Sequence, residues 1–314
     1  MGRSNRPMLH LILWYDCQYF QPEISMRLKS DLILLLVAII WGSAFAAQRV
    51  AADHLGPFVF NALRFFVGVI VLLPMARFRL KVERGMLPWI ALAGCALFAA
   101  SALQQAGMQY TTAGNAGFIT GLYVVLVPLV MVTFLRQTVS RWTWAAAMVA
   151  TLGALLLSTG GELKLNAGDA LELAGAVVWA VHVLLVGWLA RRMDILSFVI
   201  LQDLVSAVLN VLFSLFTDIS TLSGLQPAVW AVLYTGVLSV GIGYALQGIG
   251  QRHAPPTDAA LILSLEAVFA ALFGYLFLNE RLLPIQLFGC ALILGAIVLV
   301  QLRSMPREAA LQPE

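Results

Sequence analysis

Three ionisable side chains lie deep inside long apolar segments of this sequence. Arg64, Asp203 and Glu266 each come seven to nine residues after the start of such a segment. At about 1.5 Å per residue, a helix would place them near the middle of a bilayer. A charge at that depth is costly, so each side chain should face a partner or a wet cavity. Glu266 or Asp203 could there bind a proton or a cationic solute.

Each of these three residues also has a structural interpretation. For Glu266 the alternative is a structural ion pair. For Arg64 we favour a structural role, in which its charge fixes the packing of its helix. For Asp203 the alternative is a residue that faces the cytoplasm with access to water.

Aromatic side chains occupy matching positions in the middle of two segments. Trp41 and Trp179 lie away from the membrane interfaces that tryptophan usually prefers. They could form cavity walls that stack on an apolar or aromatic solute, or they could be bulky packing. His182 follows Trp179 by three residues, on the same helix face, and could relay protons. Its alternative role is hydrogen-bonded packing.

Polar side chains in three further segments could orient a solute, because a pocket needs a few donors and acceptors. The same groups could instead form hydrogen bonds between helices. Asn115 also lies near a predicted helix start, where N-capping is its obvious role. These candidates for the solute cavity are Gln104, Asn115, Tyr123, Tyr244 and Gln247.

The composition explains where these residues must be placed. Hydrophobic residues make up 61% of the 314 residues, charged residues 11%, and the mean hydropathy is +0.89. These values exclude a water-soluble domain and predict an all-α polytopic membrane protein. We expect ten transmembrane helices, at about 31–50, 57–76, 87–107, 114–135, 142–159, 168–189, 195–216, 227–249, 257–278 and 285–302.

Basic residues alternate between the linkers. If residues 1–30 form a cytoplasmic tail, the cytoplasmic linkers hold nine basic residues and the opposite linkers three. This bias predicts that both termini, including the tail 303–314, lie in the cytoplasm. The membrane that we expect to contain the protein is the inner membrane of the cell. Dispersed charges of this kind do not form a nucleic-acid site. The three cysteines match no metal-ligand spacing, and we expect neither a metal nor a cofactor. Residues 1–25 look like an upstream extension before Met26.

The two halves of the chain resemble each other. An offset of 143 residues pairs Gln104 with Gln247 and Asn115 with Asp258, and an offset of 138 pairs Trp41 with Trp179. The predicted units, residues 31–159 and 168–302, contain five helices each. Because five is odd, the units must be inverted relative to each other, an arrangement that recurs in secondary transporters.

Several motifs also resemble EamA-type members of the drug/metabolite transporter superfamily. They are AIIWGSAFAAQRV, FNALRF and the closing segment from Leu261 to Val300. The resemblance implies ten helices, a central cavity and export of metabolites, often amino acids or related compounds. The candidate coupling ion is a proton. The expected partners are lipid and a small solute, and the protein could also form a homodimer. A passive channel is the alternative. An enzyme is not expected, because HExxH, GxSxG and P-loop motifs are lacking.

Overall fold

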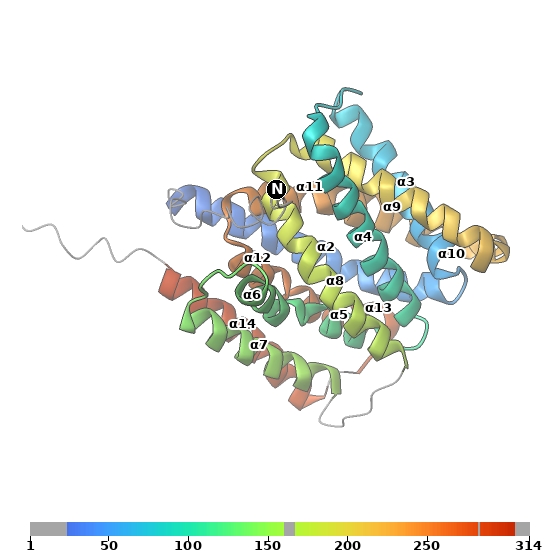
Figure 1. Cartoon of the computed structure of the whole chain (residues 1–314). Helices are drawn as coiled ribbons and strands as arrows, with labels where there is room; N and C mark the ends of the chain where they lie inside the picture. The colour runs from blue at the N-terminus through green and yellow to red at the C-terminus, as the bar shows by residue number, and fades with distance from the viewer. Residues whose placement is uncertain (1–23, 160–166, 282, 305–314) are drawn as a thin grey trace, which may run out of the picture.

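The structure of the protein is a computed structural model that describes residues 24–159, 167–281 and 283–304. Most of both predicted tails lies outside these residues. Every regular element in the described part is helical (Figure 1). The N-terminal half contains α2 (Ile24–Ala52), α3 (Pro57–Met75), η1 (Arg84–Met86), α4 (Leu87–Gly107), α5 (Ala113–Gly121), α6 (Tyr123–Thr133) and α7 (Arg141–Thr159). The C-terminal half contains α8 (Ala167–Ala190), α9 (Ile195–Thr217), η2 (Ile219–Gly224), α10 (Leu225–Tyr234), η3 (Thr235–Gly243), α11 (Tyr244–His253), α12 (Pro256–Leu263), α13 (Glu266–Leu278) and α14 (Pro284–Ser304).

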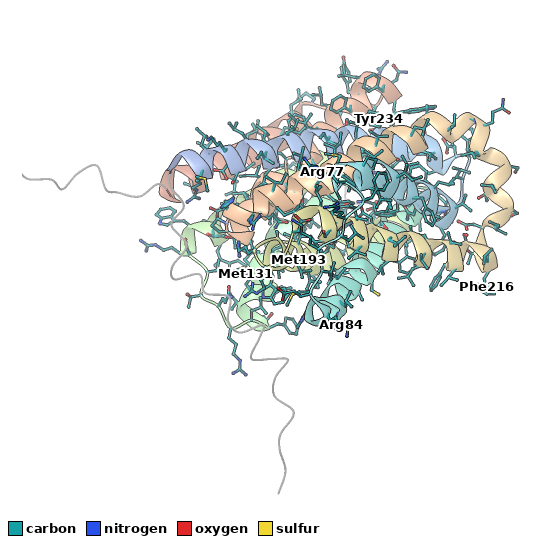
Figure 2. The ribbon with its side chains drawn as sticks, turned by 90° about the horizontal axis from the view of Figure 1, so that it is seen from above. Arg77, Arg84, Met131, Met193, Phe216 and Tyr234 are labelled. Atoms are coloured by element: carbon teal, nitrogen blue, oxygen red, sulfur yellow. The ribbon has the colours of Figure 1, made fainter. Side chains whose placement is uncertain are left out.

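Eight stretches of helix among the described residues are long and apolar enough to cross a membrane. They coincide with eight of the ten predicted spans. The other two, 142–159 and 285–302, fall on α7 and α14, and their role as spans stays a prediction; Pro284–Leu299 counts as a shorter apolar helix. Large apolar side chains also cover the outside of the bundle, as Phe216 does with 89% of its surface exposed (Figure 2). The protein is a multi-pass membrane protein.

Helices of the two halves pack against each other. If each helix is replaced by its equivalent from the other half, the pattern of helix contacts stays the same. Helix α3 packs on α9 and α7 on α14, so these equivalent helices of the two halves lie side by side (Figure 1). The contact of α5 with α13 corresponds to that of α12 with α6. The remaining contacts come in matched pairs: α4 on α8 corresponds to α11 on α2, and α2 on α13 to α8 on α6. This pattern is that of a pseudo-two-fold axis between the halves.

Contacts between linkers define two ends of the bundle. At one end, which we call the Arg191 end, Arg191 Nη2 donates to Ala254 O at 2.9 Å and the Lys81 amide to Ser197 Oγ at 2.9 Å. At the other, the Asp169 end, Thr111 Oγ1 donates to Asp169 Oδ1 at 3.0 Å. The linkers after α3, α8 and α11 thus meet at one end, and the linker after α4 lies at the other.

Two helices are interrupted at equivalent points. Helices α5 and α6 meet at Leu122, and α12 and α13 meet at Ser264 and Leu265. Leu122 and Leu265 are 143 residues apart, the offset that relates the two halves. At both points backbone bonds between residues three apart replace the α-helical pattern, as in Val125 N to Leu122 O at 3.0 Å. The second half-helices therefore begin at Tyr123 and Glu266.

A third interruption is the π-helical segment η3 between α10 and α11. Its sequence is TGVLSVGIG, and the three glycines in it, Gly236, Gly241 and Gly243, add no side-chain bulk. A Cβ on Gly68 of α3 would lie 2.4 Å from Val240 Cγ1, and one on Gly243 would lie 2.7 Å from Trp41 Nε1. Wide π turns are common at functional sites. Here they bring α2 and α3 close to the middle of the bundle.

Candidate functional site

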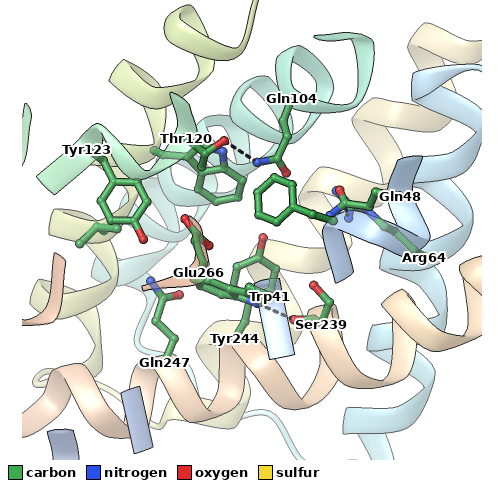
Figure 3. Close-up of a pocket in the computed structure, with 13 residues that line it drawn as sticks. Trp41, Gln48, Arg64, Gln104, Thr120, Tyr123, Ser239, Tyr244, Gln247 and Glu266 are labelled. Carbon is green, nitrogen blue, oxygen red and sulfur yellow. Dashed lines mark hydrogen bonds between the residues drawn. The ribbon is translucent and has the colours of Figure 1, made fainter. Parts of the chain in front are cut away.

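An internal cavity of about 30 Å³ lies where these interruptions meet (Figure 3). Both halves of the chain contribute to its wall. The lining residues are Trp41, Phe45, Gln48, Arg64, Gln104, Thr120, Tyr123, Trp179, Val183, Ser239, Tyr244, Gln247 and Glu266.

The cavity lies on the pseudo-two-fold axis, because equivalent residues from the two halves line it together. Offsets of 138 and 143 residues relate the halves. Four pairs that obey these offsets line the wall: Trp41 with Trp179, Phe45 with Val183, Gln104 with Gln247, and Tyr123 with Glu266. The last pair places a phenol and a carboxyl at the starts of the two second half-helices.

One wall of the cavity is aromatic and centres on Tyr244. Its ring meets Trp41 edge-on, with centroids 5.3 Å apart, and lies 6.5 Å from Trp179. Trp41 Nε1 donates to Ser239 O of the π segment at 3.1 Å, which fixes the indole against this wall. Both mid-segment tryptophans thus line one cavity, as a solute wall requires.

Arg64 contributes the positive charge of the site. It is buried, its Nη1 donates to Gln48 Oε1 at 2.8 Å, and its guanidinium lies 5.2 Å from the Phe60 ring centroid. No ion pair within 4.0 Å involves Arg64 in the described part of the chain. Its packing therefore relies on an amide and on cation–π contacts rather than on a carboxylate.

Glu266 contributes a carboxyl group, from the first turn of α13. The side chain is buried, and its carboxyl points towards the middle of the cavity between Tyr123 and Gln247 (Figure 3). The Tyr123 hydroxyl interacts with this carboxyl electrostatically, although the geometry falls short of a hydrogen bond.

Polar atoms in the wall lack partners. Among the described residues, five that line the cavity carry buried polar atoms with no hydrogen-bond partner in the protein. These atoms are Arg64 Nε, the Tyr123 hydroxyl, Trp179 Nε1, both amide atoms of Gln247 and Glu266 Oε1. Buried polar groups are normally satisfied, so this concentration makes the cavity the candidate site for a polar ligand.

Three predicted site residues do not line the cavity. Asp203 is fully buried rather than open to the cytoplasm, and it interacts electrostatically with Arg64. His182 packs beside Trp179 and Tyr244, and its Nε2 lies 3.1 Å from Gln202 Oε1. Asn115 lies in the first turn of α5 at the Asp169 end.

The N-capping role expected for Asn115 is wrong. Thr112 caps α5, and its Oγ1 accepts the hydrogen bond from the Asn115 amide at 3.1 Å. Asp258, the equivalent residue of the other half, forms an ion pair with Arg27 and belongs to the first turn of α12. Each side chain lies one turn too far into its helix to be the cap.

Sequence reasoning missed several lining residues. Phe45 and Gln48 follow Trp41 by four and seven residues, so helical spacing alone could have placed them on the same face. Thr120 precedes the helix interruption, and Ser239 belongs to the π segment. No sequence pattern considered above marks either of these irregularities.

The cavity is small in this conformation. A cavity of about 30 Å³ has room for one or two water molecules, since a water molecule needs about 10–15 Å³ of such space. Pockets for organic ligands enclose about 300–1,000 Å³. The cavity as the structure has it is therefore too small for an organic ligand.

Comparisons with known proteins agree with this architecture. The chain is 34% identical over 284 residues to an uncharacterized transporter of Archaeoglobus fulgidus, covering 88% of this chain and 87% of that protein. It is 27% identical over 290 residues to a protein of Streptantibioticus cattleyicolor named a probable terminal-alkyne amino-acid exporter, with coverages of 89% and 95%.

A solved crystal structure shares the fold. It has a TM-score of 0.71 at 19% sequence identity and covers 88% of this chain and 97% of that one. The EamA-like transporter family matches residues 28–159 and 166–302, which together make up most of the sequence. The protein therefore belongs to the EamA-like transporter family.

Proposed function

We propose that this transporter exports small zwitterionic metabolites, amino acids or related compounds, across the cytoplasmic membrane in exchange for protons. The observation that carries this proposal is the set of unpartnered polar atoms around one cavity, with a guanidinium and a carboxyl among them. A zwitterion offers one group of each charge. Arg64 Nε could donate to its carboxylate, and Glu266 could accept from its ammonium group.

The aromatic wall supports the same solute class. The side chain of an amino acid would lie against Trp41 and Trp179, whose rings favour apolar and aromatic groups. Gln247 offers an amide donor and an acceptor without partners. A relative that is named an amino-acid exporter is consistent with this choice.

Exchange for protons follows from a single carboxyl with two competing ligands. A proton and the solute ammonium cannot both occupy Glu266, so each must leave before the other binds. If the cavity opens to one side at a time, this competition couples solute export to proton entry. We further propose ten spans as two inverted units, with both termini and the Arg191 end in the cytoplasm, as the basic linkers indicate.

The test is transport by the purified protein in liposomes, with an isotope-labelled mixture of the twenty amino acids as the probe. An acidic lumen should drive saturable accumulation of one or a few of them, read by mass spectrometry. Flux that does not saturate and ignores the pH gradient would indicate a channel. Chemical conversion of an amino acid would indicate an enzyme.

The ion pair between Arg27 and Asp258 is the contact that we expect to hold the Arg191 end closed. It joins the start of α2 to the first turn of α12, and so connects the two halves. Replacing Arg27 by Ala should raise the labelling rate of a cysteine at Ser239 by about tenfold, equivalent to about 1.4 kcal/mol. The measurement is maleimide labelling in membranes, with the native cysteines removed.

A matched control is available at the opposite end. Arg49 in the last turn of α2 and Asp53, the residue after that helix, form an exposed pair, and their Nη1–Oδ1 distance is 2.7 Å. Arg49→Ala should leave labelling unchanged, and a charge exchange, Arg27→Asp with Asp258→Arg, should restore the slow rate. Equal labelling in Arg27→Ala and the parent would show that this pair is no gate.

A further inference from the structure

Glu172 is another buried carboxyl that lies outside the cavity wall. It belongs to the second turn of α8 and is fully buried. Thr120 Oγ1 donates to its Oε2 at 3.2 Å, whereas its Oε1 has no hydrogen-bond partner in the protein. No ion pair within 4.0 Å involves Glu172 in the part of the chain that the structure describes. An ionised carboxyl in such surroundings is costly unless a proton or cation joins it.

The packing around Glu172 depends on a glycine. Gly107 ends α4, and a Cβ built on it would lie 2.9 Å from Glu172 Cγ and 3.0 Å from Oε1. Only a residue without a side chain lets the carboxyl lie so close to the α4 backbone. The chain then leaves α4 through residues 108–112, before α5 begins at Ala113.

Hydrogen bonds connect Glu172 to the cavity. Gln104 Nε2 donates to Thr120 Oγ1 at 3.0 Å, and the same hydroxyl donates to Glu172. Gln104 and Thr120 both line the cavity, where their hydrogen bond lies near Glu266 (Figure 3). Glu172 and Glu266 interact electrostatically.

Other polar groups lie between Glu172 and the Asp169 end of the bundle. Asp169 precedes it by three residues on α8, so the two side chains share a helix face. Asp169 accepts from Thr111 Oγ1, and the next residue, Thr112, is exposed. The charged groups that act on Glu172 are thus Asp169 on α8 and Glu266 on α13, while α4 and α5 present the neutral Gln104 and Thr120.

We propose that Glu172 is a proton-binding site between the cavity and the Asp169 end, which in the proposed orientation faces away from the cytoplasm. A proton from solvent at that end passes Asp169 and binds the ionised Glu172. It then moves to the ionised Glu266 and leaves Glu172 ionised again. This inference rests on the proposed proton exchange, and it assigns the outer part of the proton path to α8.

Infrared spectroscopy of the full-length protein in liposomes tests the site without any solute. Difference spectra between acidic and alkaline pH should contain the carbonyl absorption of a protonated carboxyl that Glu172→Gln removes and Glu266→Gln retains. Thr120→Val should shift this absorption, because the donor to Oε2 is lost. Thr120→Ser keeps the hydroxyl and should restore the parent spectrum.

Transport of the labelled amino-acid mixture supplies a second measurement. Glu172→Gln should slow pH-driven accumulation by about a hundredfold, the lower range for loss of a positioned proton-transfer group. Exchange of labelled for unlabelled solute at equal pH should persist, because Glu172 lies outside the cavity wall. A folded Glu172→Gln variant with an unchanged spectrum, or with parental pH-driven transport, overturns the proposal. If the parent moves no amino acid, the proposed function fails, while the infrared result still decides whether Glu172 binds protons.

Discussion

Replacing Glu266 by Gln should abolish accumulation driven by a pH gradient. With one proton exchanged per solute, the parent should concentrate its solute about tenfold per pH unit, equivalent to about 1.4 kcal/mol. The glutamine keeps the shape of the side chain but can bind neither a proton nor an ammonium group in the same way. The measurement is uptake of the labelled amino-acid mixture into liposomes at several imposed gradients.

Two further variants make this result specific to the carboxyl in the cavity. Glu266→Asp keeps the charge and should keep the response to pH, although at a lower rate. Glu83 is an exposed carboxyl before η1, so Glu83→Gln should behave as the parent does. If Glu266→Gln still accumulates solute as the pH gradient increases, coupling must occur at another group.

Replacing Gly42 by Leu should prevent the bundle from assembling. Gly42 lies where α2 crosses α13, and even a Cβ there would lie 2.3 Å from Phe269 Cβ and 2.9 Å from both Ala270 N and Glu266 O. Two of these three atoms belong to the backbone and cannot rotate away. Overpacking typically costs about 1–3 kcal/mol for added methylene groups, and a leucine adds four carbons at this crossing.

The measurement is the yield of monodisperse protein by gel filtration, together with its melting temperature. Gly295 is the matched control, because it lies in α14 with nothing within 4 Å of a built Cβ. Gly295→Leu should therefore give parental yield. A stable, monodisperse Gly42→Leu protein would mean that α2 and α13 can separate without loss of the fold.

The sequence predicts the helices well because bilayer physics leaves few alternatives. An apolar stretch of about twenty residues can satisfy its backbone only as a helix. The repeat also locates much of the cavity, since the offsets pair Trp41 with Trp179 and Gln104 with Gln247, and all four residues line it. Continuing the 143-residue offset by one position past Leu122 and Leu265 would have paired Tyr123 with Glu266 as well.

The remaining parts of the site depend on tertiary packing. Glu172 lies near the start of an apolar segment, where a carboxylate usually faces water, but Gly107 of α4 and Thr120 of α5 pack against it and it is buried. His182 and Asp203 have the right depth but the wrong direction, because helix rotation is set by neighbours rather than by hydropathy. The π segment between α10 and α11 shifts the register of Tyr244, and periodicity alone does not mark it.

The size of the cavity has a consequence for any binding measurement. A space that admits only one or two waters must widen before a metabolite can enter, so part of the binding free energy is spent on moving helices apart. The dissociation constant then reflects how often the widened form occurs, as well as the contacts made within it. A substitution that only destabilises the narrow form of the cavity would therefore lower the dissociation constant, although the substituted residue contacts no atom of the solute.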